Sequence, residues 1–309
     1  MPARRRVLGG AAGLAGTAAF PFAAAFASPI LAAGMIPVDP RFRAVPKHLQ
    51  VFRTPAAEWP RVVKLCQALG IGTLALAIAP AERRRLLDDR AAAERAFAPL
   101  ARAALKVRCM VGEGAWVRGA GGALPAPVEE LLALGERSFR FEALLLDVEP
   151  QVLPEWKRGE RAGLVRGTLA LFERVRAECA QRGLKLSAAL APWYTNTPDP
   201  DRPGATFLDS CLERLDETLI MAYRNDPAAA IGFARDALAA LQRRPLPCWI
   251  GLTTQANNAP GSTYSGLGAA RFMGDVPDLY QRLKAAPAGP SVAGIAIHQY
   301  ATLRLMMEP

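Results

Sequence analysis

The stretch Leu74-Ala75-Leu76-Ala77-Ile78-Ala79 is a continuous apolar run, and Pro80 follows it directly. An apolar strand without alternating polar residues is typical of a parallel sheet that is covered on both faces. Proline is well tolerated in the first turn of a helix, so Pro80 predicts that a helix begins where the run ends. The stretch therefore indicates a β-strand followed by an α-helix.

The same strand–helix unit recurs along the chain. Strand-like runs are expected at residues 48–52, 73–79, 106–112, 143–147, 185–192, 218–222, 247–253 and 294–298. Helices are expected between them at residues 58–69, 80–104, 127–136, 161–182, 207–214, 226–243 and 271–285, and Gly70 and Gly183 are suited to end two of them. This order, over roughly 260 residues, predicts an α/β protein with a single (β/α)₈ barrel, the TIM barrel, and a short eighth helix from Ala301.

A doubly wound open sheet is the alternative fold. Such a sheet usually binds a dinucleotide at a glycine-rich turn between a strand and a helix. The glycine-rich piece at residues 119–122 follows Trp116 in a loop and opens no helix directly after a strand. No phosphate-binding P-loop is present either, so we predict no nucleotide or other cofactor.

The first 38 residues carry an export-like pattern. Residues 1–6 include three arginines, and residues 7–38 are uncharged, rich in Ala and Gly, and contain small-residue exits such as Leu31-Ala32-Ala33. The start Ala3-Arg4-Arg5-Arg6-Val7-Leu8 resembles a twin-arginine signal. We therefore predict a signal peptide over residues 1–33, a barrel domain over residues 34–309, and a periplasmic or secreted protein without stable membrane insertion after processing. The alternative is an uncleaved membrane anchor, because the run is long enough to span a bilayer.

Composition and charge restrict the class of partner. The chain is 51% hydrophobic and 21% charged, as expected for a soluble globular protein, with a formal net charge of +10. Most basic residues are arginines scattered over the helical stretches, and no block combines clustered Lys and Arg with interleaved aromatic residues. We therefore predict no nucleic-acid partner, while an acidic glycan remains an alternative to a merely solvated basic surface.

Polar and aromatic residues follow the predicted strands at their C-terminal ends. They are Glu113 and Trp116 after the third strand, Asp147 and Glu149 after the fourth, Trp193 and Tyr194 after the fifth, Tyr223 and Arg224 after the sixth, Gln255 after the seventh, and His298 and Tyr300 at the eighth. In a TIM barrel these ends form one rim, where active sites lie. Aromatic faces stack on sugar C–H surfaces, and carboxylates and amides bind sugar hydroxyls. The rim therefore predicts a pocket for a polysaccharide or oligosaccharide.

Asp147 and Glu149 are the strongest candidates for chemistry. Residues i and i+2 of a strand point to the same face, roughly 6 to 7 Å apart along the chain. Two carboxylates so placed can hold different pKa values, one ionised and one a proton donor, which glycosidic cleavage needs. The alternative is a salt-bridged or helix-capping pair, with Arg224 as the partner. Glu113 is either a second carboxylate across the barrel mouth or a solvated loop residue.

His298 is one of only two histidines in the chain. It is expected to be a substrate contact, a proton carrier or a hydrogen-bonded interior residue. His48 lies at the opposite end of its own strand and is badly placed to join His298 at a metal ion. The five cysteines have no metal-ligand spacing, and their odd number argues against a disulfide framework. We therefore predict no metal site.

Several rim motifs resemble those of the glycoside hydrolase family 18 barrel and its uncharacterised relatives. They are Leu146-Asp147-Val148-Glu149, the aromatic exit Trp193-Tyr194, Met221-Ala222-Tyr223 and the aromatic-bearing eighth strand. The resemblance covers most of the chain after residue 33 as a strand pattern, although its specific motifs are short. It implies that Glu149 is the general acid, that Asp147 orients the acetamido group of the substrate, and that Tyr223 assists.

Two positions depart from the family pattern. A further Asp is expected two residues before Asp147, where the chain has Leu145, and an Asp or Asn is expected at Arg224, although Asn225 is next to it. We therefore predict an exported glycoside hydrolase-like protein that acts on a polysaccharide or cell-wall glycan by carboxylate general acid/base catalysis, rather than a typical substrate-assisted chitinase. The alternatives are a non-catalytic glycan-binding TIM barrel and a barrel hydrolase or lyase unrelated to sugars.

Overall fold

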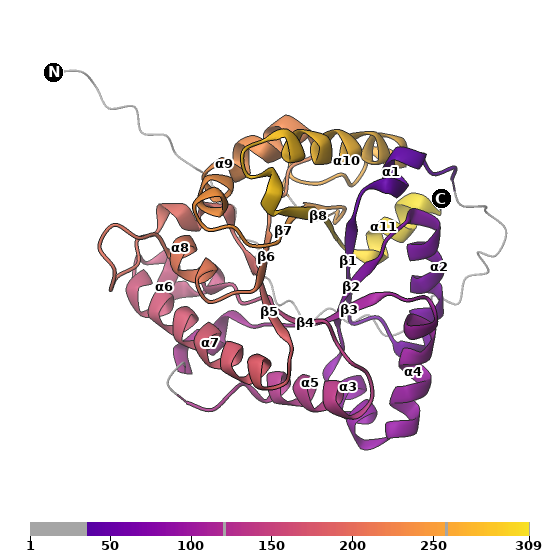
Figure 1. Ribbon diagram of the computed structural model, residues 1–309, viewed down its shortest axis with the longest axis horizontal. Coiled ribbons are helices and arrows are strands. Elements are labelled where there is room, and N and C mark those ends of the chain that lie inside the picture. Colours follow the sequence, from indigo (N-terminus) through magenta and orange to yellow (C-terminus); the bar gives the residue numbers. More distant parts are fainter. Residues whose placement is uncertain (1–35, 120–121, 257–258, 309) are drawn as a thin grey trace.

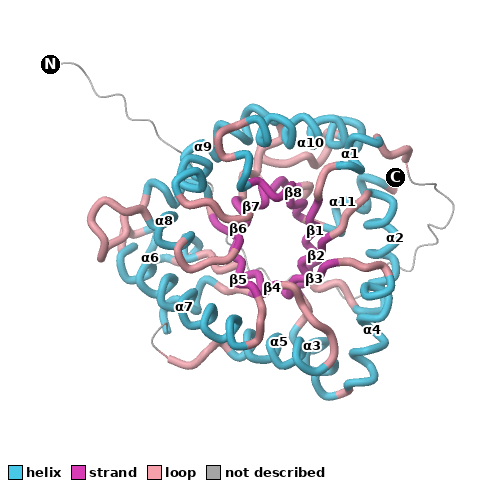
Figure 2. Tube along the Cα trace, in the orientation of Figure 1, coloured by secondary structure: helices cyan, strands magenta, loops and turns pink. Residues whose placement is uncertain are grey.

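The computed structural model describes residues 36–119, 122–256 and 259–308 (Figure 1). The predicted signal peptide at residues 1–33 lies outside the described residues. The described part of the chain forms a ring of strands inside a ring of helices (Figure 2).

Eight parallel strands close into a barrel, as the sequence predicts. The strands are β1 (Lys47–Phe52), β2 (Thr73–Ala77), β3 (Lys106–Val111), β4 (Ala143–Leu146), β5 (Lys185–Leu190), β6 (Glu217–Ile220), β7 (Cys248–Thr253) and β8 (Val292–His298). Each strand pairs with the next one in sequence, and β8 pairs with β1, so the sheet has no open edge. The (β/α)₈ barrel is confirmed, and the strand ends lie within two residues of the predicted ones.

The helices cover the outside of the barrel. They are α1 (Pro40–Ala44), α2 (Trp59–Leu69), α3 (Pro80–Asp88), α4 (Arg90–Arg102), α5 (Ala126–Arg137), α6 (Pro154–Lys157), α7 (Arg161–Gln181), α8 (Phe207–Leu212), α9 (Pro227–Arg243), α10 (Gly268–Ala285) and α11 (Tyr300–Met307). The prediction of one helix over residues 80–104 is wrong, because Asp89 separates α3 from α4. The Asp89 carboxylate accepts a hydrogen bond of 2.9 Å from the backbone N–H of Ala92 and so caps α4.

Gly70 ends α2 in the left-handed conformation, with φ +65°. A Cβ atom at this position would lie 2.6 Å from the carbonyl oxygen of Arg43, which belongs to α1. Glycine is therefore needed here both for the backbone conformation and for the close approach of α1.

The main core lies between the strands and the helices. Alternate strand residues such as Leu49 and Val51 of β1 face outward into it and are buried. The other face of each strand fills the barrel interior, where Ala75, Met110 and Leu145 pack together. The interior is therefore a packed core and not a pore, as is usual for a TIM barrel.

Polar residues close the N-terminal end of the barrel, which we call the barrel floor. Arg108 of β3 and Glu217 of β6 form a buried two-point ion pair at 2.6 and 2.9 Å. Trp249 lies beside the Arg108 guanidinium, and the His48 ring meets Trp249 edge-on at 5.5 Å. Both ring nitrogens of His48 are buried and lack a hydrogen-bond partner among the described residues. Side chains fill the barrel floor, so a functional site is expected at the C-terminal strand ends.

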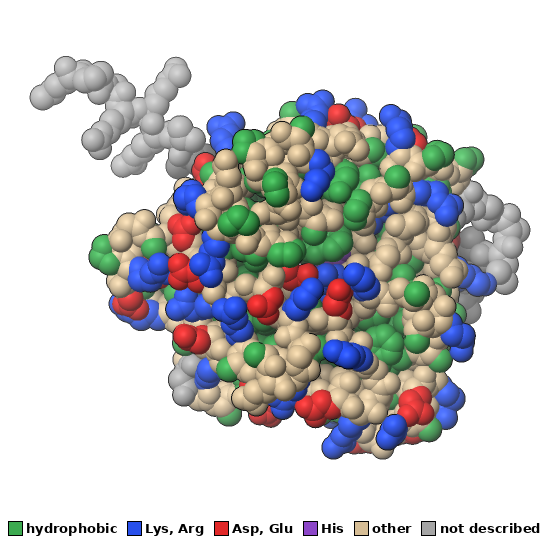
Figure 3. Space-filling view, in the orientation of Figure 1, with side chains coloured by type: hydrophobic (Ala, Val, Ile, Leu, Met, Phe, Trp, Pro, Cys, Tyr) green, Lys and Arg blue, Asp and Glu red, His purple; other side chains and the backbone are tan. Residues whose placement is uncertain are grey.

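The surface and the thiols agree with the sequence. Basic and acidic side chains are interspersed over the face seen along the barrel axis (Figure 3). All five cysteines are buried and free. Within the described ranges, no helix is both long and apolar enough to cross a bilayer.

Candidate functional site

Asp147 and Glu149 follow β4 directly at the C-terminal end of the barrel. The backbone N–H of Asp147 still donates to the Val111 carbonyl of β3 at 3.0 Å, so the pairing continues one residue past the strand. Leu145, two residues earlier, is fully buried in the barrel interior. The alternation of the strand therefore directs Asp147 toward the barrel mouth above Leu145.

The loop after β3 packs against the backbone of Asp147 and Glu149. A Cβ atom on Gly112 would lie 2.0 Å from the carbonyl oxygen of Asp147, and one on Gly114 would lie 2.6 Å from that of Glu149. No side chain other than hydrogen fits at such distances, so the two glycines let the β3 loop touch the backbone that carries the carboxylates. Glu113, between these glycines, is itself exposed.

Burial raises the pKa of both carboxyl groups. The pKa of Asp147 rises to about 6 because of burial, and that of Glu149 rises to about 7 through burial and then the neighbouring charge of Asp147. Neither carboxylate forms an ion pair with any residue of the described chain. The two carboxyl groups titrate as a coupled pair in which ionisation of one disfavours ionisation of the other, so one can keep its proton beside an ionised partner, as a proton donor next to a carboxylate requires.

Arg224 does not neutralise the pair. Its guanidinium lies over the Phe233 ring of α9 at 3.6 Å and donates to the Tyr223 carbonyl at 2.7 Å. The salt-bridged pair that the sequence left open is thus absent from the described residues. The structure turns Arg224 toward α9 rather than toward the carboxylates.

Gln151 connects Glu149 to Tyr194. The amide nitrogen of Gln151 donates to Glu149 Oε1 at 2.8 Å, and the Tyr194 hydroxyl donates to the amide oxygen of Gln151. Gln151 lies in the 3₁₀ helix η3 (Pro150–Val152), directly after Glu149. Nothing in the sequence analysis singled out this residue, and the only available signal is its position two residues after the candidate acid.

Aromatic residues form a wall beside Glu149. Tyr194 is fully buried and packs against Phe207 and Trp156, with ring centroids at 4.5 and 5.9 Å. Trp193 meets Tyr194 edge-on at 5.1 Å and remains partly exposed. Both residues belong to the 3₁₀ helix η4 (Pro192–Asn196), which directly follows the β5 exit. The wall combines a rigid buried phenol with an accessible indole.

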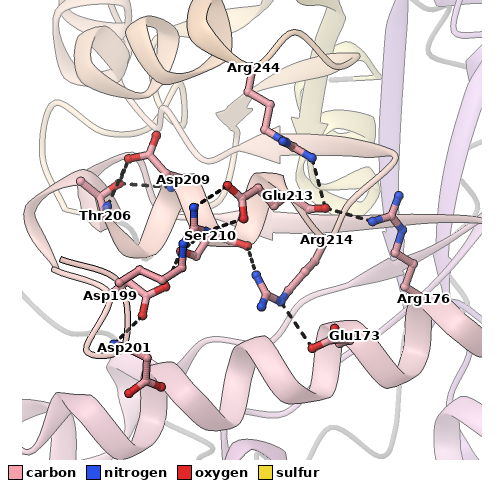
Figure 4. A network of polar contacts seen from close by, with 11 residues as sticks. Glu173, Arg176, Asp199, Asp201, Thr206, Asp209, Ser210, Glu213, Arg214 and Arg244 are labelled. Atoms are coloured by element: carbon pink, nitrogen blue, oxygen red, sulfur yellow. Dashed lines mark hydrogen bonds and ion pairs between the residues drawn. The ribbon is translucent and has the colours of Figure 1, made fainter. Parts of the chain in front are cut away.

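A polar network fixes the segment between this wall and α8 (Figure 4). Asp199 accepts hydrogen bonds from the Ser210 hydroxyl at 2.5 Å and from the Asp201 backbone N–H at 2.9 Å. Thr206 and Asp209 form a reciprocal capping box at the start of α8. The segment after Trp193 and Tyr194 is therefore tied to α8, which stabilises the position of the aromatic wall.

Tyr223 and His298 form a second group at the mouth. The two rings stack with centroids 5.7 Å apart, and a Cβ atom on Gly251 would lie 3.2 Å from the Tyr223 ring. The pKa of Tyr223 is raised well above its usual value by burial and by the charges of Asp147 and Glu149. Its hydroxyl therefore stays protonated within electrostatic range of both carboxyl groups.

His298 is held by two glutamine side chains. Its Nδ1 lies 2.7 Å from Gln50 Oε1, and its Nε2 lies 3.1 Å from Gln255 Oε1. Burial lowers the pKa of His298 to about 4, so the ring is neutral near pH 7, and its single N–H can donate to only one of these two amide oxygens. This environment suits a fixed hydrogen-bonding role for His298, packed against Tyr223. It does not suit the role of a proton carrier.

Three predicted rim residues lie apart from these groups. Trp116 is half-buried on the 3₁₀ helix η2 (Gly114–Gly119), which packs against α7. Tyr300 is buried in the outer core at the start of α11, and its hydroxyl has no hydrogen-bond partner among the described residues. Arg224 faces α9. The structure thus brings together Asp147, Glu149, Trp193, Tyr194, Tyr223, Gln255 and His298, with the Glu113 loop behind the carboxylates.

Other parts of the described chain offer less chemistry. A hollow of about 350 Å³ lies among α2, α3 and α4, but Ala, Pro and Arg side chains line it and no carboxylate does. No group of three or more His, Cys, Asp or Glu residues in the described ranges is arranged to hold a metal ion. The carboxylate pair beside Tyr223 and Gln151 is therefore the best candidate for a site.

Comparisons with known proteins show the fold. No protein-family model matches the chain, and no curated protein matches it. The structure is similar to a GH18 chitinase from Pseudoalteromonas aurantia, with 14% identity, a TM-score of 0.52, and coverage of 83% of this chain and 94% of that one. It is similar to a chitinase from Chromobacterium violaceum (13%, 0.51, 84% and 95%) and to the spore cortex-lytic enzyme SleL from Bacillus megaterium (13%, 0.50, 85% and 72%). At these identities the similarity shows a shared TIM-barrel fold.

Proposed function

We propose that this protein is an exported glycosidase that cleaves a polysaccharide or cell-wall glycan, with Glu149 as its general acid. The observation that carries the proposal is the half-buried carboxyl pair at the β4 exit. The pKa of Glu149 is raised to about 7 by burial and by Asp147, so this carboxyl can keep its proton near neutral pH. A general acid works best when its pKa lies near the working pH.

The two carboxyl groups take different parts in the proposed reaction. Glu149 gives its proton to the glycosidic oxygen as the bond from that oxygen to the sugar carbon breaks. Asp147, as the ionised member of the pair, can stabilise the positive charge that develops on the sugar or orient an acetamido group. A water molecule then adds to the sugar carbon and returns a proton to Glu149. The Tyr223 hydroxyl, which stays protonated, lies within electrostatic range of both groups and can donate to the substrate.

The aromatic wall supports a sugar substrate. Trp193 is partly exposed and held edge-on by Trp156 at 5.9 Å and Tyr194 at 5.1 Å, so it can offer an indole face at little cost in side-chain order. Similar barrels include chitinases and a spore cortex-lytic enzyme, and we extend their general substrate class, a glycan, to this chain.

Hydrolysis of a glycan panel tests the proposal. The purified protein is incubated with bacterial and plant polysaccharides, and new reducing ends are measured. We expect cleavage of at least one glycan and a loss of about 10² to 10⁴ in rate for Glu149→Gln, which cannot donate a carboxylic proton. Full activity of Glu149→Gln would exclude Glu149 as the acid and make Glu113 the next candidate.

A non-catalytic glycan-binding barrel is the second candidate. Leu145 favours it, because a fully buried leucine in the barrel interior stands where the resemblance expects a further acid. This candidate predicts that the wild type and Glu149→Gln bind the same glycan equally well and that neither releases reducing ends. Trp193→Ala should then abolish binding.

A further inference from the structure

Gln151 makes two hydrogen bonds whose directions depend on each other. Its amide nitrogen donates to Glu149 Oε1 at 2.8 Å, and its amide oxygen accepts from the Tyr194 hydroxyl. An amide has one donating end and one accepting end. Whatever fixes one end of Gln151 therefore fixes the other.

Tyr194 fixes the accepting end. The tyrosine is fully buried, and the rings of Trp156, Trp193 and Phe207 surround it. Its pKa is raised well above the usual value by burial and by the nearby charges of Glu149 and Asp147, so the hydroxyl remains a donor. A buried hydroxyl that lost its acceptor would pay its full desolvation cost. The oxygen of Gln151 must therefore face Tyr194, and its nitrogen must face Glu149.

This orientation distinguishes the two oxygens of Glu149. An oxygen that accepts an N–H hydrogen bond is favoured as the unprotonated oxygen of a carboxylic acid, so the proton is favoured on the other one. We propose that Gln151 is a positioning residue that, held by the Tyr194 hydroxyl, keeps Glu149 Oε1 as an acceptor and confines the acid proton to Oε2. The use of that proton on a glycan rests on the proposed function, whereas its confinement does not.

The other groups around Glu149 cannot replace Gln151. Asp147 is a like charge, which favours the protonated acid without choosing an oxygen. Tyr223, three residues after β6 ends, is within electrostatic range of both carboxyl groups but makes no hydrogen bond to either among the described residues, and Glu113 lies exposed on the loop after β3. Gly114 and the backbone of η3 hold the main chain of Glu149, since Val152 N–H donates to its carbonyl at 3.2 Å. Among the described residues, Gln151 alone donates to this carboxyl.

A direct titration of Glu149 tests the proposal without any substrate. The carboxyl carbon of glutamate is labelled with ¹³C, and the Glu149 signal is assigned by its loss in Glu149→Gln. The variants are Gln151→Met, which keeps the size but not the amide, and Tyr194→Phe, which keeps the ring but not the hydroxyl. Gln67→Met, at an exposed site on α2, is the matched control.

We expect both variants to raise the pKa of Glu149. Gln151→Met removes a donor that lowers this pKa, and Tyr194→Phe frees the amide to turn its oxygen toward the acid. A hydrogen bond of ordinary strength corresponds to a rise of about 0.5 to 1 on the pH scale. Because Tyr194 acts through Gln151, the double variant should equal Gln151→Met, while Gln67→Met should equal the wild type.

The outcomes separate this inference from the proposed function. An unchanged pKa of Glu149 in Gln151→Met, or additive effects in the double variant, would overturn the inference even if the protein cleaves a glycan. The expected rises, found in a protein that cleaves no glycan, would support the positioning role and count against the proposed function. If Gln151→Met does not fold, Tyr194→Phe alone must still raise the pKa.

Discussion

Replacing Glu149 with Gln should stabilise the folded protein, and the gain should grow with pH. Burial and the neighbouring Asp147 raise the pKa of Glu149 from 4.5 to about 7. A carboxyl whose pKa is raised by folding favours the folded state below its unfolded pKa, and this contribution is lost as the pH rises through the folded pKa. A difference of about 2.5 between the two pKa values corresponds to about 3 kcal/mol. Gln has no proton to lose, so the variant escapes this loss.

Urea unfolding between pH 4 and 8.5 measures the effect. The unfolding free energies of the wild type and Glu149→Gln should lie close together near pH 4 and differ by about 3 kcal/mol at pH 8, with the variant more stable. Glu129→Gln, at an exposed site on α5, controls for the change in net charge. A difference that does not change with pH, or a variant that is less stable at pH 8, would refute the reasoning from burial.

Three further predictions concern other parts of the molecule. Trp193→Ala should weaken glycan binding about tenfold or more, as measured by titration calorimetry with the identified glycan, and unchanged affinity would remove Trp193 from the binding surface. The variant should also be less stable in urea unfolding, because the indole packs against Trp156 and Tyr194. Glu217→Gln leaves the buried Arg108 without its closest partner and should cost about 3 kcal/mol in urea unfolding, whereas a cost below about 1 kcal/mol would contradict a buried ion pair. Mass spectrometry of protein from the periplasm should find a chain that starts near residue 34, and a full-length chain in the membrane fraction would indicate an anchor instead.

The strand pattern could be predicted because a barrel strand is covered on both faces. In a run such as that at residues 73–79 almost every residue is apolar, which predicts a buried strand, and Pro80 marks the start of the following helix. The break at Asp89 could not be predicted in the same way. The residues on both sides of it favour helix, and only the capping hydrogen bond to Ala92 shows that the chain changes direction there.

The candidate site could be predicted only as far as the strands extend. Alternation along β4 places Asp147 toward the barrel mouth, because β structure has a fixed period. Gln151 comes after Pro150 in a short 3₁₀ helix, where no period relates sequence to direction, so its contact with Glu149 needed the structure. The prediction that Tyr300 lies at the rim is wrong for a related reason. β8 ends at His298 and α11 begins at Tyr300, so the phenol lies in the outer core.

The ion pair on the barrel floor limits how the chain can be divided. Arg108 and Glu217 are 109 residues apart in sequence, and their strands, β3 and β6, lie across the ring from each other (Figure 2). A fragment ending after β4 would contain the arginine without this carboxylate, and the complementary fragment would contain the carboxylate without the arginine. The N-terminal half would keep only the longer contact of Arg108 with Glu142 at 3.5 Å, and the C-terminal half would have to bury the Glu217 charge without its partner or leave its inner face open to water. The two halves of this barrel are therefore expected to fold as one cooperative unit and not as separate modules.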